Sequence, residues 1–146
     1  MEKQKSWAKA LQNFGVLLLG LASAGNFFSG LYSVYLGVFK STSPKTAYHW
    51  IYIILGVLHF IFSIMMARAF IMLANRRIRG HHYGIIALVS GVGLGLAQMA
   101  AARTLTISQD ITVYVTYFTI LCLAILMIFM IPFIWKELRF YGGRKN

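Results

Sequence analysis

Four long apolar segments alternate with short polar or charged stretches along the chain. They run from about Leu11 to Phe39, Thr46 to Leu73, Gly84 to Ala102 and Ile111 to Trp135. Each is long enough to cross a hydrocarbon core of about 30 Å, which takes about 20 helical residues. Because a bilayer supplies no water to satisfy backbone polar groups, segments of this length must be helical. The pattern predicts an all-α, four-helix transmembrane bundle in which residues 1–146 form a single domain.

Turn-forming residues fall between these segments and support the same division. Ser43 and Pro44 suit the N-cap and the first residue of the second helix. Gly80 is expected to separate the second helix from the third, and Asp110 suits the start of the fourth. Pro132 is expected to kink the last turns of the fourth helix. The first segment is too long for a signal peptide and lacks its cleavage site, so we expect a retained helix.

Small and polar residues recur at spacings of three and four within each segment. Residues at this spacing share one side of a helix, so each predicted helix carries a single small-and-polar stripe. Small residues on such a stripe allow two helices to approach closely. The glycines for which we expect this packing role are Gly30, Gly56, Gly91 and Gly95.

Composition decides between a soluble protein and a membrane protein. Hydrophobic residues make up 59% of the chain and charged residues only 12%, with a mean hydropathy of +0.70. Charged residues run at about 25% in soluble globular proteins. A chain of 146 residues with this composition has no means of covering its apolar surface in water. We therefore expect a multi-pass integral membrane protein, in a prokaryotic plasma membrane or an organelle membrane, with the lipid bilayer as its first partner.

The basic residues are distributed unequally between the two ends of the predicted bundle. The net charge is +11, from 14 Lys and Arg against 3 Asp and Glu. Only Lys40, Lys45 and Arg103 fall at one end, and the other basic residues fall at the opposite end, which also carries both termini. The positive-inside rule therefore predicts that both termini lie in the cytoplasm. The residues expected to fix the topology and to contact anionic lipid are Arg68, Arg76, Arg77 and Arg79. This distribution explains the charge without a nucleic-acid partner.

Polar side chains on the stripes are expected to face the interior of the bundle, where they find hydrogen-bond partners. The candidate residues for a polar core or a ligand site are His59, Asn26, Gln98, Thr119, Thr116, Tyr52 and Tyr117. Asn26 and His59 lie about ten residues inside the external ends of their helices, roughly 15 Å at the helical rise. The cytoplasmic half of every helix is almost wholly apolar. We therefore expect a hydrogen-bonded layer or an externally open pocket with a dry floor, and no continuous aqueous channel.

The combinations of residues needed for catalysis, metal binding or coupled transport are missing from the apolar segments. The acidic residues are Glu2, Asp110 and Glu137, all outside the expected hydrocarbon region, where proton and cation carriers generally place a carboxylate. The one cysteine, Cys122, excludes a disulfide within the chain and any CxxC site. The sequence shows no nucleophile with a matching base and acid. We therefore expect a protein that is not an enzyme and that holds no metal ion, unless His59 binds haem.

The sequence leaves three functions open. The first is a small non-catalytic accessory or structural subunit that packs in a larger membrane complex or a homo-oligomer. The second is a quinone-, lipid- or haem-binding subunit with its ligand in the external half of the bundle, near His59. His49 and His59 lie about 15 Å apart along one helix and cannot bind one haem b together, so Met99 or another subunit would supply the second ligand. The third is a small-solute permease.

Overall fold

The computed structural model describes the backbone of residues 2–39, 47–104, 109–132 and 134–136. Side chains are described for residues 6–39, 50–100, 113, 115–132 and 134–136. The helices in this part of the chain are α1 (Glu2–Phe39), α2 (Ala47–Ala74), α3 (Ile78–Thr104) and α4 (Gln109–Phe129). The all-α prediction is confirmed. Sequence predictions outside the described residues concern Lys40, Ser43, Pro44, Lys45 and the side chains of His49, Arg103 and Asp110.

Three of the helices are long and apolar enough to cross a membrane. Their apolar segments are Ser6–Phe39, Trp50–Ala74 and Ile78–Ala100. The described apolar part of α4, Val115–Phe129, is shorter. Because about 20 helical residues span a hydrocarbon core, these three helices support the prediction of a membrane protein.

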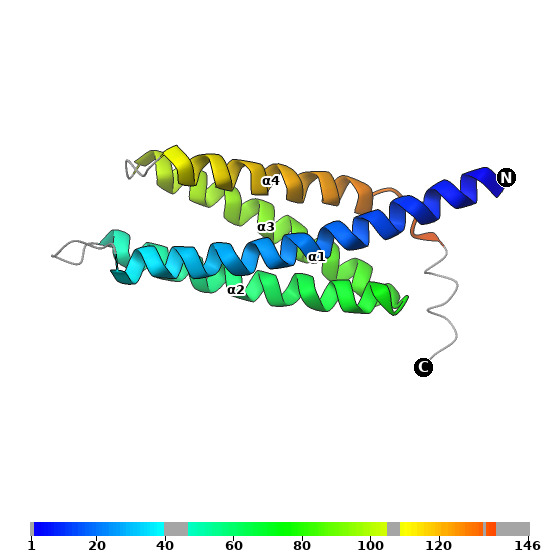
Figure 1. Ribbon diagram of the computed structural model, residues 1–146, viewed down its shortest axis with the longest axis horizontal. Helices are drawn as coiled ribbons and strands as arrows, with labels where there is room; N and C mark the ends of the chain where they lie inside the picture. Colours follow the sequence, from blue (N-terminus) through cyan, green and yellow to red (C-terminus); the bar gives the residue numbers. More distant parts are fainter. Residues whose placement is uncertain (1, 40–46, 105–108, 133, 137–146) are drawn as a thin grey trace.

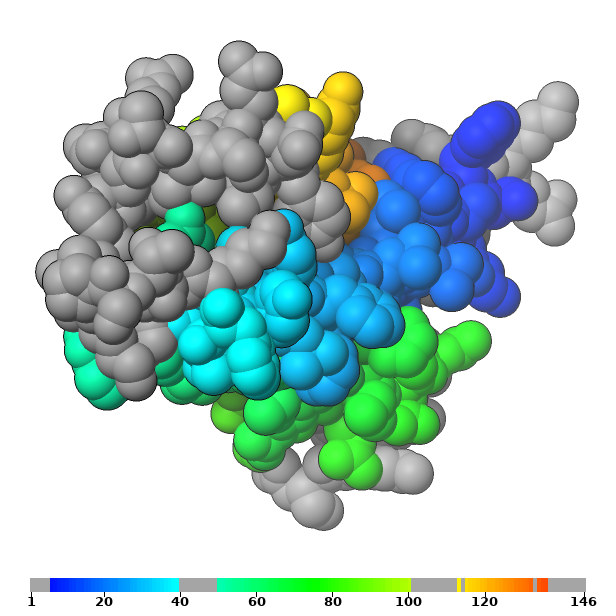
Figure 2. Space-filling model, turned by 60° about the vertical axis from the view of Figure 1, so that its left-hand side comes forward, coloured from blue at the N-terminus to red at the C-terminus, as the bar shows by residue number. Residues whose placement is uncertain are grey.

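Successive helices run in opposite directions, so that the last turn of each helix and the first turn of the next lie at the same end of the bundle (Figure 1). α1 packs along α2, α2 packs on α3 and α3 packs on α4, while a smaller contact between α1 and α4 closes the ring. Figure 2 shows α1 on the outer face, with part of α2 beside it. The N-terminus, the α2–α3 turn and the end of α4 share one end of the bundle (Figure 1). We call this the basic end, because it carries Lys9, Arg68, Arg76, Arg77, Arg79 and Lys136.

The apolar core fills the half of the bundle nearer the basic end. Its largest fully buried apolar side chains come from all four helices and from the segment after α4: Leu19, Met66, Leu88, Ile125, Phe129 and Ile134. Large apolar side chains also lie on the outside, such as Leu21 at 65% and Ile64 at 69% exposure. A water-facing surface of this kind would promote aggregation, whereas a lipid-facing surface is normally apolar.

α4 ends at Phe129, and the prediction that it continues to Trp135 was wrong because Pro132 stops the helix. Proline has no N–H to donate to the Ile128 carbonyl four residues earlier, and its ring disfavours a helical conformation at the preceding residue. The indole Nε1 of Trp135 donates to the Ile128 carbonyl at 3.1 Å. The backbone N–H of Ile131 also donates to the Ile128 carbonyl, at 3.3 Å, so these two donors take the place of the N–H that Pro132 lacks.

The connection between α2 and α3 is a Schellman turn. The N–H of Arg77 donates to the Met72 carbonyl at 2.8 Å, and the N–H of Arg76 donates to the Leu73 carbonyl at 2.9 Å. Arg76 has a φ of 55° and is the one non-glycine residue with positive φ in the described part of the chain. Glycine is usual at this position, because a Cβ raises the energy of the left-handed conformation.

Gly80 lies inside α3 and does not separate the two helices, contrary to the sequence-based expectation. A Cβ at this position would lie 2.7 Å from the Cβ of Met72 and 2.9 Å from the backbone nitrogen of Leu73. The absence of a side chain lets the first turn of α3 pack directly on the last turn of α2. Gly80 is therefore a packing residue.

Candidate functional site

His59 lies at the centre of a buried set of hydrogen bonds that joins three helices. Its side chain is 1% exposed and projects from α2. Nδ1 lies 2.7 Å from Oδ1 of Asn26 on α1, and Nε2 lies 2.6 Å from Nε2 of Gln98 on α3. The Ser29 hydroxyl lies 3.4 Å from the same Nε2. We call the following residues the polar network: Ser23, Asn26, Ser29, His59, Ser63, Met66 and Gln98.

The partners of Asn26 determine which imidazole nitrogen of His59 carries the proton. The Asn26 amide nitrogen donates to Sδ of Met66 at 3.3 Å, which leaves its carbonyl oxygen to accept from Nδ1–H of His59. Nε2 of His59 then accepts a hydrogen bond from the Gln98 amide. A neutral imidazole has one donor and one acceptor, so both nitrogens have partners. A haem iron would require the Nε2 lone pair that this hydrogen bond occupies.

Ser23 and Ser63 extend the polar network by one helical turn toward the basic end. The Ser23 hydroxyl donates to the Ser63 carbonyl, and the Ser63 hydroxyl donates to the Ser23 carbonyl, both at 2.9 Å. This reciprocal pair joins the backbones of α1 and α2 through two short side chains. Interhelical hydrogen bonds in membranes contribute about 0.6–2 kcal/mol each, so the network stabilises one register of α1, α2 and α3.

The polar network lies beside the closest approach of α1 and α2. A Cβ on Gly56 would lie 2.9 Å from the Gly30 carbonyl oxygen and 2.6 Å from a methyl of Val34. A Cβ on Gly30 would lie 3.0 Å from the Gly56 carbonyl oxygen and 3.3 Å from the Cβ of His59. Both glycines are buried. Without side chains they allow the two backbones to approach closely enough for His59 to reach Asn26.

α4 packs on α3 at Gly91 and Gly95, the other pair of predicted packing glycines. A Cβ on Gly91 would lie 3.6 Å from Sγ of Cys122, and a Cβ on Gly95 would overlap Thr119. The Thr119 hydroxyl donates to the Val115 carbonyl of its own helix at 2.8 Å. Thr119 is buried as expected of a core residue, but this hydrogen bond stays within α4 and does not reach His59.

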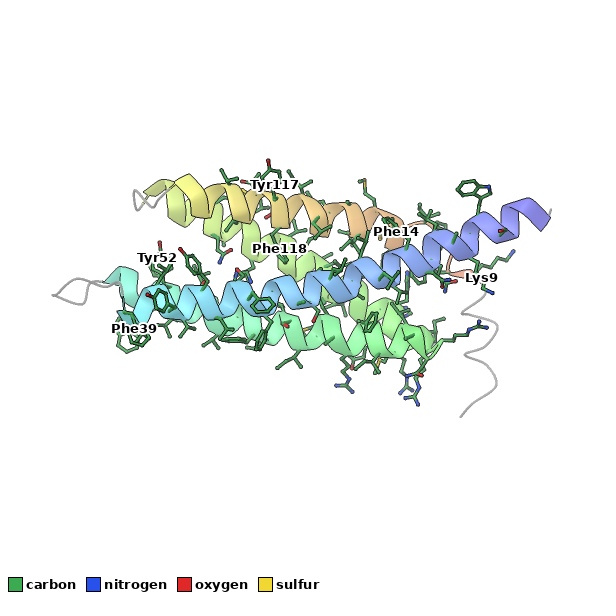
Figure 3. All side chains as sticks on the ribbon, viewed as in Figure 1. Lys9, Phe14, Phe39, Tyr52, Tyr117 and Phe118 are labelled. Atoms are coloured by element: carbon green, nitrogen blue, oxygen red, sulfur yellow. The ribbon has the colours of Figure 1, made fainter. Side chains whose placement is uncertain are left out.

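α4 contributes an aromatic ring next to the polar network. The ring centroids of Phe118 and His59 lie 6.2 Å apart in an edge-on arrangement, and Figure 3 shows Phe118 between α4 and α1. Tyr117 points outward in Figure 3 and is 70% exposed, contrary to its expected place in the polar core. Two successive steps along a helix turn by about 200°, so Tyr117 and Thr119 lie on opposite faces.

Thr116 and Tyr52 are half-buried. Both lie nearer than His59 does to the end of the bundle opposite the basic end. Figure 3 shows Tyr52 near that end, beside α1. Of the seven predicted polar-core residues, His59, Asn26 and Gln98 are brought into direct hydrogen bonding. The other members of the network are Ser23, Ser29, Ser63 and Met66. The sequence signal for Ser23 and Met66, which were not predicted, was their spacing from Asn26 and His59 on the same two helices.

His81 belongs to an aromatic cluster at the basic end that the sequence did not predict. Its Nε2 donates to the Phe129 carbonyl at 2.8 Å, and its ring stacks on the Phe129 ring at a centroid distance of 5.6 Å. The Trp135 ring lies 4.8 Å from His81 and 4.6 Å from Phe129. The last carbonyls of a helix lack partners within the helix, so His81 and Trp135 cap α4. The sequence signal was Pro132, which ends the helix.

The arginines expected to contact lipid lie at the basic end. Arg68, Arg76, Arg77 and Arg79 are all exposed. The guanidinium of Arg68 lies 5.3 Å from the centroid of the Tyr83 ring, a cation–π contact between α2 and α3. Their shared location is the arrangement that contact with anionic headgroups requires.

Comparison of the chain with protein-family models, with curated proteins and with solved structures finds no match. Within the described ranges, no three His, Cys, Asp or Glu side chains lie close enough together to hold a metal ion. The features that bear on function are therefore the polar network, the aromatic cluster and the apolar outer surface.

Proposed function

We propose that this protein is a small, non-catalytic integral membrane protein that serves as an accessory or structural subunit of a larger membrane assembly. The observation that carries the proposal is the division between core and surface. The polar side chains of the network hydrogen-bond to one another, while large apolar side chains lie on the outside. A catalytic site needs polar groups directed at a substrate, whereas an apolar outer surface suits lipid and other transmembrane helices.

A second group of aromatic side chains, Phe27, Phe28 and Phe60 on the outside of α1 and α2, supports a protein partner, and we call it the phenylalanine patch. Phe27 is 46% exposed and Phe28 is 66% exposed. The Phe27 ring makes edge-on contacts with Phe28 at 6.0 Å and with Phe60 at 5.3 Å. Aromatic side chains are enriched at the centres of protein interfaces. The proposed partner is another membrane subunit or a further copy of this chain.

The proposed topology has four spans, with both termini in the cytoplasm. Every Lys and Arg whose side chain the structure describes lies at the basic end. The positive-inside rule assigns such an end to the cytoplasm. This arrangement leaves the phenylalanine patch of α1 and α2 within the membrane, where a partner helix would meet it.

The test is extraction of the full chain from its native membrane in a mild detergent or a polymer nanodisc. We expect it to elute with stoichiometric partners, or as a discrete oligomer, identified by mass spectrometry. Phe28→Ala is expected to reduce this association several-fold. Met127→Ala, at an equally exposed position on α4, is the matched control and should leave it unchanged. A monodisperse monomer without partners would contradict the proposal.

A second candidate function is binding of a quinone or a lipid, which the half-buried positions of Gln98 and Tyr52 favour. These side chains lie on the side of His59 that faces the opposite end of the bundle. Haem, the remaining ligand of this group, would have to displace the Gln98 amide from Nε2 of His59. The same preparation tests this candidate by absorption spectroscopy and by mass spectrometry of extracted organic molecules. A haem would give a Soret band that His59→Ala abolishes, and a quinone or lipid would be lost in Gln98→Leu. A colourless preparation without a co-purifying organic molecule would exclude this function.

A further inference from the structure

A cavity of about 270 Å³ lies at the basic end, between the first turns of α3 and the segment that follows α4. Most of its wall is aliphatic or aromatic, and two imidazoles supply polar groups. The residues that line it include Ile85, His81, His82, Phe129, Met130 and Trp135. We propose that this cavity binds the interfacial part of an anionic phospholipid from the surrounding leaflet. The proposal depends on a membrane location and is independent of the subunit function.

The walls of the cavity are fixed by hydrogen bonds to backbone atoms. His81 donates to the Phe129 carbonyl at 2.8 Å, and Trp135 donates to the Ile128 carbonyl at 3.1 Å. Nδ1 of His82 lies 3.4 Å from the Ile78 carbonyl. Side chains that are already ordered lose little conformational entropy when a ligand binds. The cavity is therefore preorganised for an occupant.

Charge next to the cavity favours an anion. Arg79 precedes His82 by three residues on α3, a spacing that brings side chains together on one helix face. Lys136 directly follows Trp135. Both basic side chains are exposed, and no carboxylate occurs among the side chains that the structure describes. Basic residues at a membrane boundary attract anionic headgroups.

The surroundings of the cavity suit an amphipathic ligand better than a small soluble anion. Met130, which is apolar, is 63% exposed, and His82, which follows the exposed Arg79 by three residues, is exposed as well. An occupant therefore meets both apolar and basic surroundings. A phospholipid has an acyl region for the first and a phosphate for the second. Inorganic phosphate alone would leave the apolar walls uncovered.

The test uses the full chain, purified in neutral detergent and stripped of lipid. Phosphatidylglycerol, phosphatidylcholine with the same acyl chains, or inorganic phosphate is then added, and bound lipid is counted by native mass spectrometry. We expect one phosphatidylglycerol to bind at least tenfold more tightly than phosphatidylcholine. Equal binding of the two lipids would overturn the proposal. Displacement of phosphatidylglycerol by equimolar inorganic phosphate would assign the site to a free anion and would also overturn it.

Two tryptophan variants of α4 and its end test whether the cavity itself is the site. Met130→Trp places a bulky ring at the cavity wall and is expected to weaken phosphatidylglycerol binding at least fivefold. Met127→Trp is the matched control, because Met127 is 66% exposed and does not line the cavity. Each variant is first compared with the wild type by its lipid-free melting temperature. If both variants bind the lipid equally well, the cavity is not the site.

A pair of charge variants separates a specific site from general surface attraction. Arg79→Gln combined with Lys136→Gln is expected to weaken phosphatidylglycerol binding at least fivefold. Arg76→Gln combined with Arg77→Gln removes the same charge from the adjacent turn and is expected to have less than a twofold effect. An equal loss in both double variants would show that the lipid responds to total charge, and would refute the cavity site.

Discussion

The closest approach of α1 and α2 allows a direct test of how the polar network is held. We predict that Gly56→Ala destabilises the protein by separating these helices. The added Cβ would lie 2.9 Å from the Gly30 carbonyl oxygen, whereas ordinary contacts begin at 3.4 Å, so the backbones must separate by about 0.5 Å. The Val34 methyl at 2.6 Å adds to the clash, because a β-branched side chain is restricted at χ1.

The separation affects the polar network one turn away. His59 follows Gly56 by three residues, and its hydrogen bond to Asn26 is 2.7 Å long. An increase of about 0.5 Å would bring this hydrogen bond to the outer limit of good geometry. Overpacking and the weakened hydrogen bond together are expected to lower the free energy of unfolding by about 2–4 kcal/mol.

Cys122 provides the assay for this prediction. It is the one cysteine of the chain and is 0% exposed, so a fluorogenic maleimide reacts with it on unfolding. Thermal midpoints are compared for the wild type, Gly56→Ala and the control Gly93→Ala. A Cβ on Gly93 would meet nothing within 4 Å, and alanine favours the helix, so the control should match or exceed the wild type. If Gly56→Ala is as stable as this control, close backbone contact does not hold the network.

Three further substitutions test the turn, the network and the end of α4 in the same unfolding assay. Arg76→Gly removes the Cβ from a residue in the left-handed conformation and should stabilise the protein by about 0.5–1 kcal/mol. Arg77→Gly should destabilise it, and equal effects of the two substitutions would show that the positive φ of Arg76 does not limit stability. Asn26→Leu leaves Nδ1–H of His59 unpaired and should cost about 1–3 kcal/mol, with a changed imidazole ¹⁵N spectrum as the check. Trp135→Phe should cost about 1 kcal/mol and speed hydrogen exchange at the end of α4; unchanged exchange would count against capping.

The helical fold could be predicted because long apolar segments have few alternatives in a bilayer. The helix ends were harder, since tertiary contacts decide them. Pro132 was expected to kink α4, yet the helix ends before it, at Phe129. The Ile128 carbonyl accepts hydrogen bonds from the Ile131 N–H and from the Trp135 indole instead. Gly80 was interpreted as a break, although it belongs to α3 and packs against α2. A glycine has the same sequence signature in either role.

The polar network was predictable where residues share both a stripe and a depth. Asn26 and His59 meet this condition on neighbouring helices, and they form a hydrogen bond. Tyr117 lies in the same external half of the bundle, but its side chain is not on the inward face of α4, which explains its exposure. The contact of His81 with Phe129 depends on how α3 and the end of α4 meet. Spacing within one helix carries no information about such a meeting.

The tight turn between α2 and α3 has a consequence for biosynthesis. Only residues 75–77 connect helices of 28 and 27 residues, and backbone hydrogen bonds close the turn. Once the turn forms, the two helices have too little connecting chain to separate. In the proposed topology they enter the bilayer as one helical hairpin, with the guanidinium groups at its tip retained on the side of synthesis. The orientations of both spans are then determined in a single insertion step.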